Sequence, residues 1–441
     1  MVIKNIFDSK FSDVPYWWED APPSKLDAKE LPRKVDVVVV GSGYAGLNCA
    51  IELAKSGTDV LVVDKINIGS GASSRAGGLT SGRAGVSKLI NLEATVGERK
   101  ARRILEEADQ AYDHLQTFIE REHIDCDFVQ CGRFMGAHSS QAYDKIAFKM
   151  VEYNKSENPD FEMIPLIQQH KIVNSEYYKG GMFNHNAGTI HPAKFHGELV
   201  RIAIDSGVKL VSNTLVQKII STKTGKRILT SNGTILAEHV MIGTGGYTDG
   251  LSPYHRKRII PMSSTLIATE KIGTDRVHEI LPKGCPVIDT KRIISYARPS
   301  PDGERILFGG RARFTPVSAK KSTTILHRTM SKIFPSLEKT QITHSWTGLM
   351  AFTFDFLPKL GVENGNHYAI ACNGGSGIVM MSWLGRRAAQ NILGKNNSVS
   401  AFQGLNYKTH PLYTGVPWFV PMVGTWYRFC DWMEEKIDST R

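Results

Sequence analysis

Residues 35–46 read Val-Asp-Val-Val-Val-Val-Gly-Ser-Gly-Tyr-Ala-Gly, and this stretch decides the fold. The β-branched run before the first glycine predicts a parallel strand buried on both faces. The G-x-G-x-x-G pattern then leads into a helical segment, residues 47–57. In such a unit Gly41 allows the tight turn, Gly43 lets the backbone approach a pyrophosphate, and Gly46 lets helix and strand pack closely. The positive end of the helix faces the phosphates.

A second strand is predicted over residues 59–64, Asp-Val-Leu-Val-Val-Asp, and it ends on an acidic residue. Asp64 follows the glycines at the spacing typical of a residue that accepts hydrogen bonds from the ribose hydroxyls. Its charge would repel a 2′-phosphate. The complete strand–turn–helix–strand context favours a dinucleotide-binding fold over a nucleotide-free α/β turn, and NAD and FAD both satisfy it.

Length and composition set limits on the class of protein. The chain has 441 residues, too many for one ordinary core, so two domains are expected. No apolar run is long enough for a membrane span, and the N-terminus lacks the apolar core of a secretory signal. Six scattered cysteines without a C-x-x-C pair predict reduced thiols, no metal site and a cytoplasmic location. The net charge of +11 is spread thinly, so no nucleic-acid partner is expected.

Residues 68–79 read Ile-Gly-Ser-Gly-Ala-Ser-Ser-Arg-Ala-Gly-Gly-Leu and distinguish the two cofactors. So many small residues in a row are typical of backbone that lies against a flat ligand. G-A-S-S-R-A-G-G-L resembles the G-A-S-x-R-x-G-G signature of the D-amino acid oxidase-like (DAO) flavoprotein family. The resemblance implies FAD, and non-covalent FAD, because no cysteine stands between His344 and Ala371 where some members attach the flavin.

The resemblance extends over about residues 15 to 430 and implies an α/β fold. A Rossmann-type FAD-binding domain would be interleaved with an α+β substrate domain built on an antiparallel sheet. The expected division is an N-terminal arm of residues 1–33, an FAD-binding domain of residues 34–95, 190–255 and 345–441, and a substrate domain of residues 96–189 and 256–344.

Several stretches are expected to contact FAD. The first turn and the second strand contribute Gly41, Gly43, Tyr44, Ala45, Gly46, Asp64 and Lys65. By the resemblance, the phosphate, ribityl and flavin portions meet Ser73, Ser74, Arg75, Ala76, Gly77, Gly78 and Leu79. The adenosine and pyrophosphate portions would meet Val216, Thr244 and Gly245. A third glycine turn adds Gly374, Gly375, Ser376, Gly377 and Ile378, and the helix that starts there would stabilise negative charge on the reduced flavin.

The candidates on the substrate side are Tyr44, His191, Arg298, Trp346 and Met350. Arg298 precedes a proline, as does the arginine that clamps the substrate carboxylate in D-amino acid oxidases; the alternative is a salt bridge at a sheet edge. His191 either faces the active site or is a capping or core histidine.

Residues 346–358 resemble the family segment W-x-G-x-R-P-x-x-x-D-x-x-P. Met350 stands where glycine oxidase-type members carry an arginine for the substrate carboxylate. A thioether cannot bind an anion. A small α-amino acid is therefore disfavoured, and the departure favours an amine, or an acid whose carboxylate lies far from the oxidised carbon.

The resemblance implies an FAD-dependent oxidoreductase acting on CH–NH or CH–NH2 donors, and the γ-glutamylputrescine oxidase-like branch is the most similar. The partners would be a small amine or amino acid, such as a γ-glutamylputrescine-like or secondary amine, and oxygen or another electron acceptor. The alternatives are a membrane-docked dehydrogenase that reduces quinone or an electron-transfer protein, an RNA-modifying flavoenzyme and a non-enzymatic flavin-binding subunit.

The tail, residues 411–429, is rich in aromatic residues and has two interpretations. The favoured one is packing, with the aromatic residues Tyr16, Trp17 and Trp18 of the N-terminal arm as a candidate contact. The alternative is an interfacial membrane anchor. The oligomeric state is left open.

Overall fold

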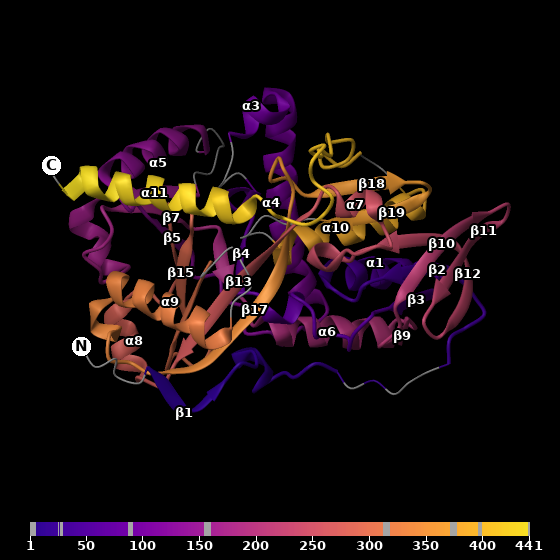
Figure 1. Cartoon of the computed structure of the whole chain (residues 1–441), viewed down its shortest axis with the longest axis horizontal. Helices are drawn as coiled ribbons and strands as arrows, with labels where there is room; N and C mark the ends of the chain where they lie inside the picture. Colours follow the sequence, from indigo (N-terminus) through magenta and orange to yellow (C-terminus); the bar gives the residue numbers. More distant parts are fainter. Residues whose placement is uncertain are drawn as a thin grey trace.

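The computed structural model describes residues 6–24, 26, 30–86, 91–153, 160–311, 318–370, 377–395 and 399–439. Within these residues the chain forms two large sheets and a short pair of strands, β4 (Leu79–Ser81) and β8 (Ala187–Thr189). Of the two large sheets, the eight-stranded one is called the smaller sheet and lies in the right half of Figure 1. The nine-stranded one is called the larger sheet and lies in the left half.

The smaller sheet has a parallel centre. Its parallel strands, in spatial order, are β9 (Lys209–Val211), β3 (Val60–Val63), β2 (Lys34–Val40), β12 (Gly233–Ile242) and β19 (Asn366–Ile370). The antiparallel strands β11 (Gly225–Thr230), β10 (Val216–Thr222) and β18 (Lys359–Glu363) complete it. Val37 to Val40 are buried, as the β-branched run predicts for a central parallel strand.

The helices of this half share one core. They are α1 (Tyr44–Ala54), α4 (Glu98–Arg121), α6 (Pro192–Asp205) and α10 (Gly377–Ile392), with the short α2 (Arg83–Val86), α3 (Leu92–Val96) and α7 (Pro253–Arg256) nearby. Two glycines let α1 approach its neighbours closely. A Cβ on Gly46 would lie 1.9 Å from the Gly41 carbonyl oxygen, and one on Gly385 of α10 would lie 2.1 Å from the Ala45 carbonyl oxygen.

The larger sheet is mainly antiparallel. Its strands, in spatial order, are β1 (Phe7–Ser12), β17 (Ile342–Phe352), β13 (Ile260–Thr269), β16 (Ile306–Gly310), β15 (Ser295–Pro299), β14 (Val287–Asp289), β5 (Arg133–Gly136), β7 (Gly181–Asn184) and β6 (Phe161–Ile164). The pairs β1–β17 and β14–β5 are parallel. The helices of this half are α5 (Ser140–Tyr153), α8 (Thr274–Ile280), α9 (Ala319–Ile333) and α11 (Val420–Ser439).

The division of the chain into domains stays a proposal, and several contacts favour boundaries other than the expected ones. β17 runs through the expected boundary at residue 345 and belongs wholly to the larger sheet. The N-terminal arm contributes β1 to that sheet, and α11 lies over it (Figure 1). Helix α4 instead shares the core of α1 and α10, because its apolar face meets theirs.

The two aromatic segments near the termini lie in separate places. Tyr16 and Trp17 are buried in a cluster with Trp346, whereas Tyr413 and Val420 of the tail pack against residues of β13 and β17. The expected packing of the tail against the arm is therefore wrong. The arm does pack onto the body of the protein, as expected, because Trp17 is fully buried there.

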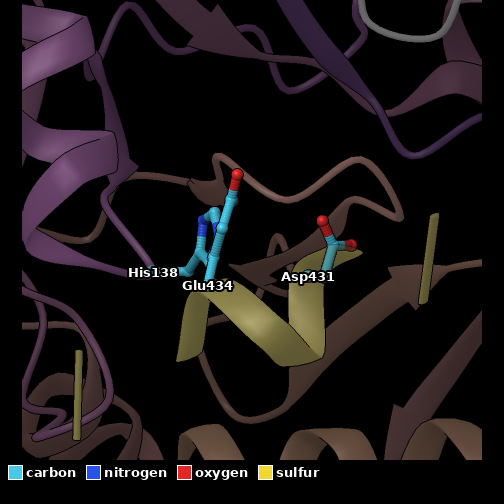
Figure 2. A group of neighbouring side chains, drawn as sticks. All are labelled: His138, Asp431 and Glu434. Carbon is cyan, nitrogen blue, oxygen red and sulfur yellow. The ribbon is translucent and has the colours of Figure 1, made fainter. Parts of the chain in front are cut away.

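Helix α11 is attached to the larger sheet by charged groups. The Arg292 guanidinium donates to Asp431 at 2.9 Å and to both carboxylate oxygens of Glu434 at 2.8 and 3.1 Å. The His138 ring contacts Glu434 at 3.0 Å, and Figure 2 shows His138 beside Glu434, with Asp431 on the same helix. These three side chains are close enough to hold a metal ion, but the guanidinium already occupies both carboxylates.

No helix in the described parts of the chain combines the length and apolar character needed to cross a bilayer.

The first prediction concerns the arm. Trp17→Phe should lower the free energy of unfolding by about 1–3 kcal/mol, because the Ala76 carbonyl loses a buried hydrogen-bond donor. The Trp17 Nε1 donates to that oxygen at 2.9 Å. Trp418→Phe is the matched control, since its indole also donates to a carbonyl but is 54% exposed. Urea unfolding of both variants measures the difference, and an equal effect would contradict the anchoring role of Trp17.

The second prediction concerns pH. Hydrogen bonds from Arg292, aided by His138 and Lys145, lower the pKa of Glu434 from 4.5 to about 2. A carboxyl whose pKa is lowered by folding stabilises the fold above its unfolded pKa, and this stabilisation disappears as the pH falls through the folded pKa.

The difference in urea midpoint between the wild type and Glu434→Gln should therefore be largest near neutral pH. It should shrink as the pH falls from about 4.5 towards about 2. Glu162→Gln, which removes an exposed contact with His185, is the control and should change little at any pH. A Glu434 effect that is independent of pH would contradict the ion pair.

Candidate active site

A long cavity of about 310 Å³ lies between the two sheets. It is bordered by the turns that follow β2, β3 and β12, at the carboxyl ends of parallel strands, where ligands of open α/β sheets bind. The first residues of α1 and α10 also border it. Two helix N-termini therefore direct unpaired N–H groups and partial positive charge toward one space.

The first glycine turn has the geometry that the sequence predicts. Gly41 adopts a φ of 100°, and a Cβ there would meet the Gly243 carbonyl oxygen at 3.0 Å. The Asp64 carboxylate accepts hydrogen bonds from the backbone N–H and the hydroxyl of Ser42, at 2.9 and 2.7 Å. Both bonds go to Oδ2 of Asp64 and fix the carboxylate beside the turn. The other oxygen, Oδ1, accepts from the Ile66 N–H at 3.2 Å.

Side-chain donors from distant segments hold the loop of residues 73–79, whose last residue begins β4. Tyr44 Oη donates to the Ser73 carbonyl at 2.6 Å, and Trp346 Nε1 donates to the Arg75 carbonyl at 3.0 Å. Trp17 Nε1 donates to the Ala76 carbonyl. The donors come from distant parts of the chain, so the loop can keep its shape only when both halves of the protein are folded around it.

Arg298 belongs to this set of donors, and the structure gives it a role different from the expected carboxylate clamp. One of its Nη atoms donates to the carbonyls of Gly78 and Ile190 at 3.0 and 2.9 Å. Burial lowers its pKa to about 10, so it stays charged at neutral pH. The side chain is not among the cavity-lining residues. Its charge is directed to two buried carbonyl oxygens, of which that of Gly78 also accepts from the Ile190 N–H at 2.9 Å.

His191 and Trp346 also lie outside the cavity lining. His191 caps α6, where its Nδ1 accepts from the Lys194 N–H at 3.1 Å, and burial lowers its pKa to about 4. In the structure His191 is therefore a capping histidine, and its imidazole ring is neutral at physiological pH. Trp346 supports the loop from behind. Of the substrate-side candidates, Tyr44 and Met350 do line the cavity.

Most of the expected FAD contacts line the cavity. These are Gly41, Gly43, Tyr44, Ala45, Asp64, Lys65, Ser73, Arg75, Ala76, Gly77, Gly78, Leu79, Val216, Thr244, Gly245, Gly377 and Ile378. Gly46 and Ser74 are buried behind the lining. Gly374, Gly375 and Ser376 fall outside the described residues.

Two glycines of the loop make room for protein side chains as well as for a ligand. A Cβ on Gly77 would meet the Tyr296 ring at 2.8 Å, and one on Gly309 would meet it at 2.1 Å. A Cβ on Gly78 would meet the Ile190 carbonyl at 2.2 Å and an Arg298 nitrogen at 2.5 Å. The small residues of this segment are thus required by the packing of Tyr296 and Arg298 too.

Three charged or aromatic residues that line the cavity on the side of the larger sheet were not predicted from the sequence: Arg133, Tyr296 and Arg311. Arg311 directly follows Gly309-Gly310 at the end of β16. Its guanidinium lies 4.7 Å from the centre of the Phe352 ring, and among the described residues no carboxylate forms an ion pair with it. Burial lowers its pKa to about 10. The sequence feature that could have identified Arg311 as a site residue is its position immediately after a glycine pair at the end of a predicted strand.

The sequence model of the family described as FAD dependent oxidoreductase (DAO) matches residues 36–391. The chain belongs to this family. It is similar to the probable oxidoreductase OrdL of Rhizobium meliloti (strain 1021), with 29% identity over 400 residues that cover 90% of this chain and 92% of that one. It is also similar to the gamma-glutamylputrescine oxidoreductase of Escherichia coli (strain K12), with 28% identity over 386 residues, 85% of this chain and 88% of that one.

Among solved structures, the glycine oxidase of Geobacillus kaustophilus matches with a TM-score of 0.71 at 22% identity, over 86% of this chain and 100% of that one. This likeness shows the fold alone. The expected α/β fold class and the DAO family are thus confirmed. The protein is an FAD-dependent oxidoreductase of the amine and amino acid oxidase type.

The residues present fit FAD. The cavity runs from the Asp64 carboxylate, past the glycine turn and the N-terminus of α1, to the N-terminus of α10. A carboxylate, a turn without side chains and two helix ends are the groups that ribose, pyrophosphate and a flavin ring require in that order. Lys65 and Arg75 are the cations beside these groups, and Lys65 also forms an exposed ion pair with Asp249.

The third prediction tests the first turn. Gly46→Ala should lower the free energy of unfolding by about 1–3 kcal/mol and reduce the FAD bound per chain, because the new methyl group overlaps the Gly41 carbonyl. Gly197→Ala is the control, since it also lies in a helix but a Cβ there meets nothing within 4 Å. Flavin absorbance and urea unfolding give both readouts. Full flavin content in the Gly46 variant would contradict the close approach.

Proposed function

We propose that the protein oxidises the C–N bond of an amine that carries an anionic group several bonds from the reacting carbon. The observation that carries this proposal is Arg311, a half-buried cation on the cavity wall with no carboxylate partner among the described residues. A relative named gamma-glutamylputrescine oxidoreductase, similar over most of both chains, supports it. γ-Glutamylputrescine has an amine at one end and a carboxylate at the other.

The position of Met350 supports the same class of substrate. It lines the cavity near Leu349, at the place where glycine oxidase-type members are expected to hold a carboxylate next to the reacting carbon. A thioether offers no charge there. Arg311 directly follows β16, and its guanidinium reaches the Phe352 ring of β17, so the cation of this wall comes from a neighbouring segment and not from position 350 itself.

The remaining walls of the cavity are suited to an uncharged amine nitrogen. Leu79, Leu266, Ile288 and Tyr296 give an apolar lining between the charged positions. An apolar surrounding disfavours the charged form of an amine, so it lowers the pKa of the substrate nitrogen. The neutral nitrogen needs no protein base, because its lone pair assists departure of hydride from the adjacent carbon. When bound, FAD supplies the acceptor of that hydride, and water hydrolyses the resulting imine.

The direct test is anaerobic bleaching of the bound flavin by a panel of amines. γ-Glutamylputrescine, N-methyl amino acids and uncharged diamines should be compared at equal concentration. We expect amines with a distant carboxylate to bleach the flavin fastest. If no amine or amino acid bleaches it, the proposed function is wrong. Formation of hydrogen peroxide in air then distinguishes oxygen from another electron acceptor.

The fourth prediction concerns Arg311. Arg311→Gln should raise the KM for amines with a distant carboxylate about 100-fold, equivalent to about 3 kcal/mol for a charge-assisted pair. The KM for uncharged amines should stay the same. Arg276→Gln is the control, because Arg276 is exposed and donates to the Ser336 carbonyl far from the cavity lining. An equal loss for charged and uncharged amines would show that Arg311 acts only on structure.

A further inference from the structure

The C-terminal helix α11 has its acidic side turned toward the protein. Asp431 and Glu434 bind Arg292, Glu435 binds Lys332 at 2.6 Å, and Asp438 accepts from the Ser140 N–H at 2.8 Å. Figure 2 shows two of these acids on the inner side of the helix. Every aspartate and glutamate of α11 is therefore taken up by contacts with the body of the protein.

The outer side of the same helix is apolar. Met422, Trp426, Phe429, Met433 and Ile437 recur at intervals of three and four residues and are 38–69% exposed. We call these five residues the α11 stripe. Such spacing places them on one face of a helix. No other described element buries them, and Trp418, just before the helix, is also 54% exposed. This pattern is the reverse of an ordinary surface helix, whose apolar side faces the core.

The exposed charged residues of α11 are positive. Arg428 and Lys436 are exposed on this helix, while its acids face inward. The whole chain carries a net charge of +11. An apolar stripe with Lys436 at its edge, on a protein of net positive charge, complements an anionic lipid surface. A second copy of the chain would bring the same cations together across the contact, which is unfavourable.

The residue types in the α11 stripe also favour a lipid surface. Tryptophan and phenylalanine are preferred at the boundary between lipid headgroups and acyl chains, where an amphipathic helix lies in the plane of the surface. A soluble monomer seldom exposes so continuous an apolar surface without a partner for it.

We propose that α11 docks the protein on an anionic bilayer through the α11 stripe, with the helix lying in the interface. The start of the helix joins this surface to the active site. Val420 packs in one cluster with Phe352 and partly buried Met350, and Met350 lines the cavity. Docking would therefore place this end of the cavity close to the lipid surface. The inference goes beyond the proposed function and does not depend on which amine is oxidised.

The fifth prediction is co-sedimentation of the full chain with vesicles of phosphatidylcholine containing about one third phosphatidylglycerol. The wild type should sediment with them, less so with pure phosphatidylcholine or at high salt. The double variant Trp426→Ser, Phe429→Ser should bind at least tenfold more weakly, since burying each aromatic side chain in an apolar surrounding is worth about a factor of ten or more.

Two further variants complete the experiment. Leu236→Ser, which removes an exposed apolar residue from the smaller sheet, should bind like the wild type. Lys436→Glu should weaken binding to anionic vesicles and leave binding to neutral vesicles unchanged. Flavin absorbance in each variant shows that the protein is folded, and amine-dependent bleaching in solution should be the same in all four proteins.

Absence of vesicle binding by the wild type would overturn the proposal, as would equal binding by all variants. If ultracentrifugation instead finds a dimer that the double variant abolishes, and no vesicle binding occurs, the α11 stripe is a contact between copies and the membrane proposal is wrong. Neither result affects the proposed function, which only a failure of bleaching would contradict.

Discussion

The structure depends on the capture of backbone carbonyls in the loop of residues 73–79 by side chains from elsewhere. Tyr44, Trp17, Trp346 and Arg298 donate to the carbonyls of Ser73, Ala76, Arg75 and Gly78. The Gly78 carbonyl also accepts from the Ile190 N–H at 2.9 Å, and burying any of these carbonyls unpaired would be costly. The donors come from the arm, from α1 and from strands β15 and β17 of the larger sheet, so the cavity wall forms only when these distant segments have folded together.

The need for donors to these carbonyls gives Arg298 and Arg311 different surroundings. Arg298 on β15 is directed to carbonyls, and its charge stabilises the loop instead of a substrate. Arg311, at the end of the adjacent strand β16, lines the cavity beside an aromatic ring. A cation in a water-poor space attracts an anion strongly, and this contrast is the physical basis for assigning the anionic end of the substrate to Arg311.

Charge also explains the orientation of α11. Its acids find Arg292 and Lys332 on the body, and a helix fixed by ion pairs on one side leaves its apolar residues on the other. Hydrophobic burial alone would have turned the helix around. The observed orientation makes sense when the apolar side has a partner of its own, and the link through Val420 to the cavity wall connects that partner to the site.

The sequence by itself determined the dinucleotide turn, the acidic strand end at Asp64 and the DAO family, because these depend on local backbone geometry that only glycines at fixed spacing permit. Most of the residues that it predicted to contact FAD also line the cavity. Only the tertiary structure decided that Arg298 supports a loop while Arg311 faces the cavity, that His191 caps α6, and that the aromatic tail lies apart from the arm. The physical reason is that the direction of a side chain on a strand, and the partner it meets, depend on which distant segments pack beside it.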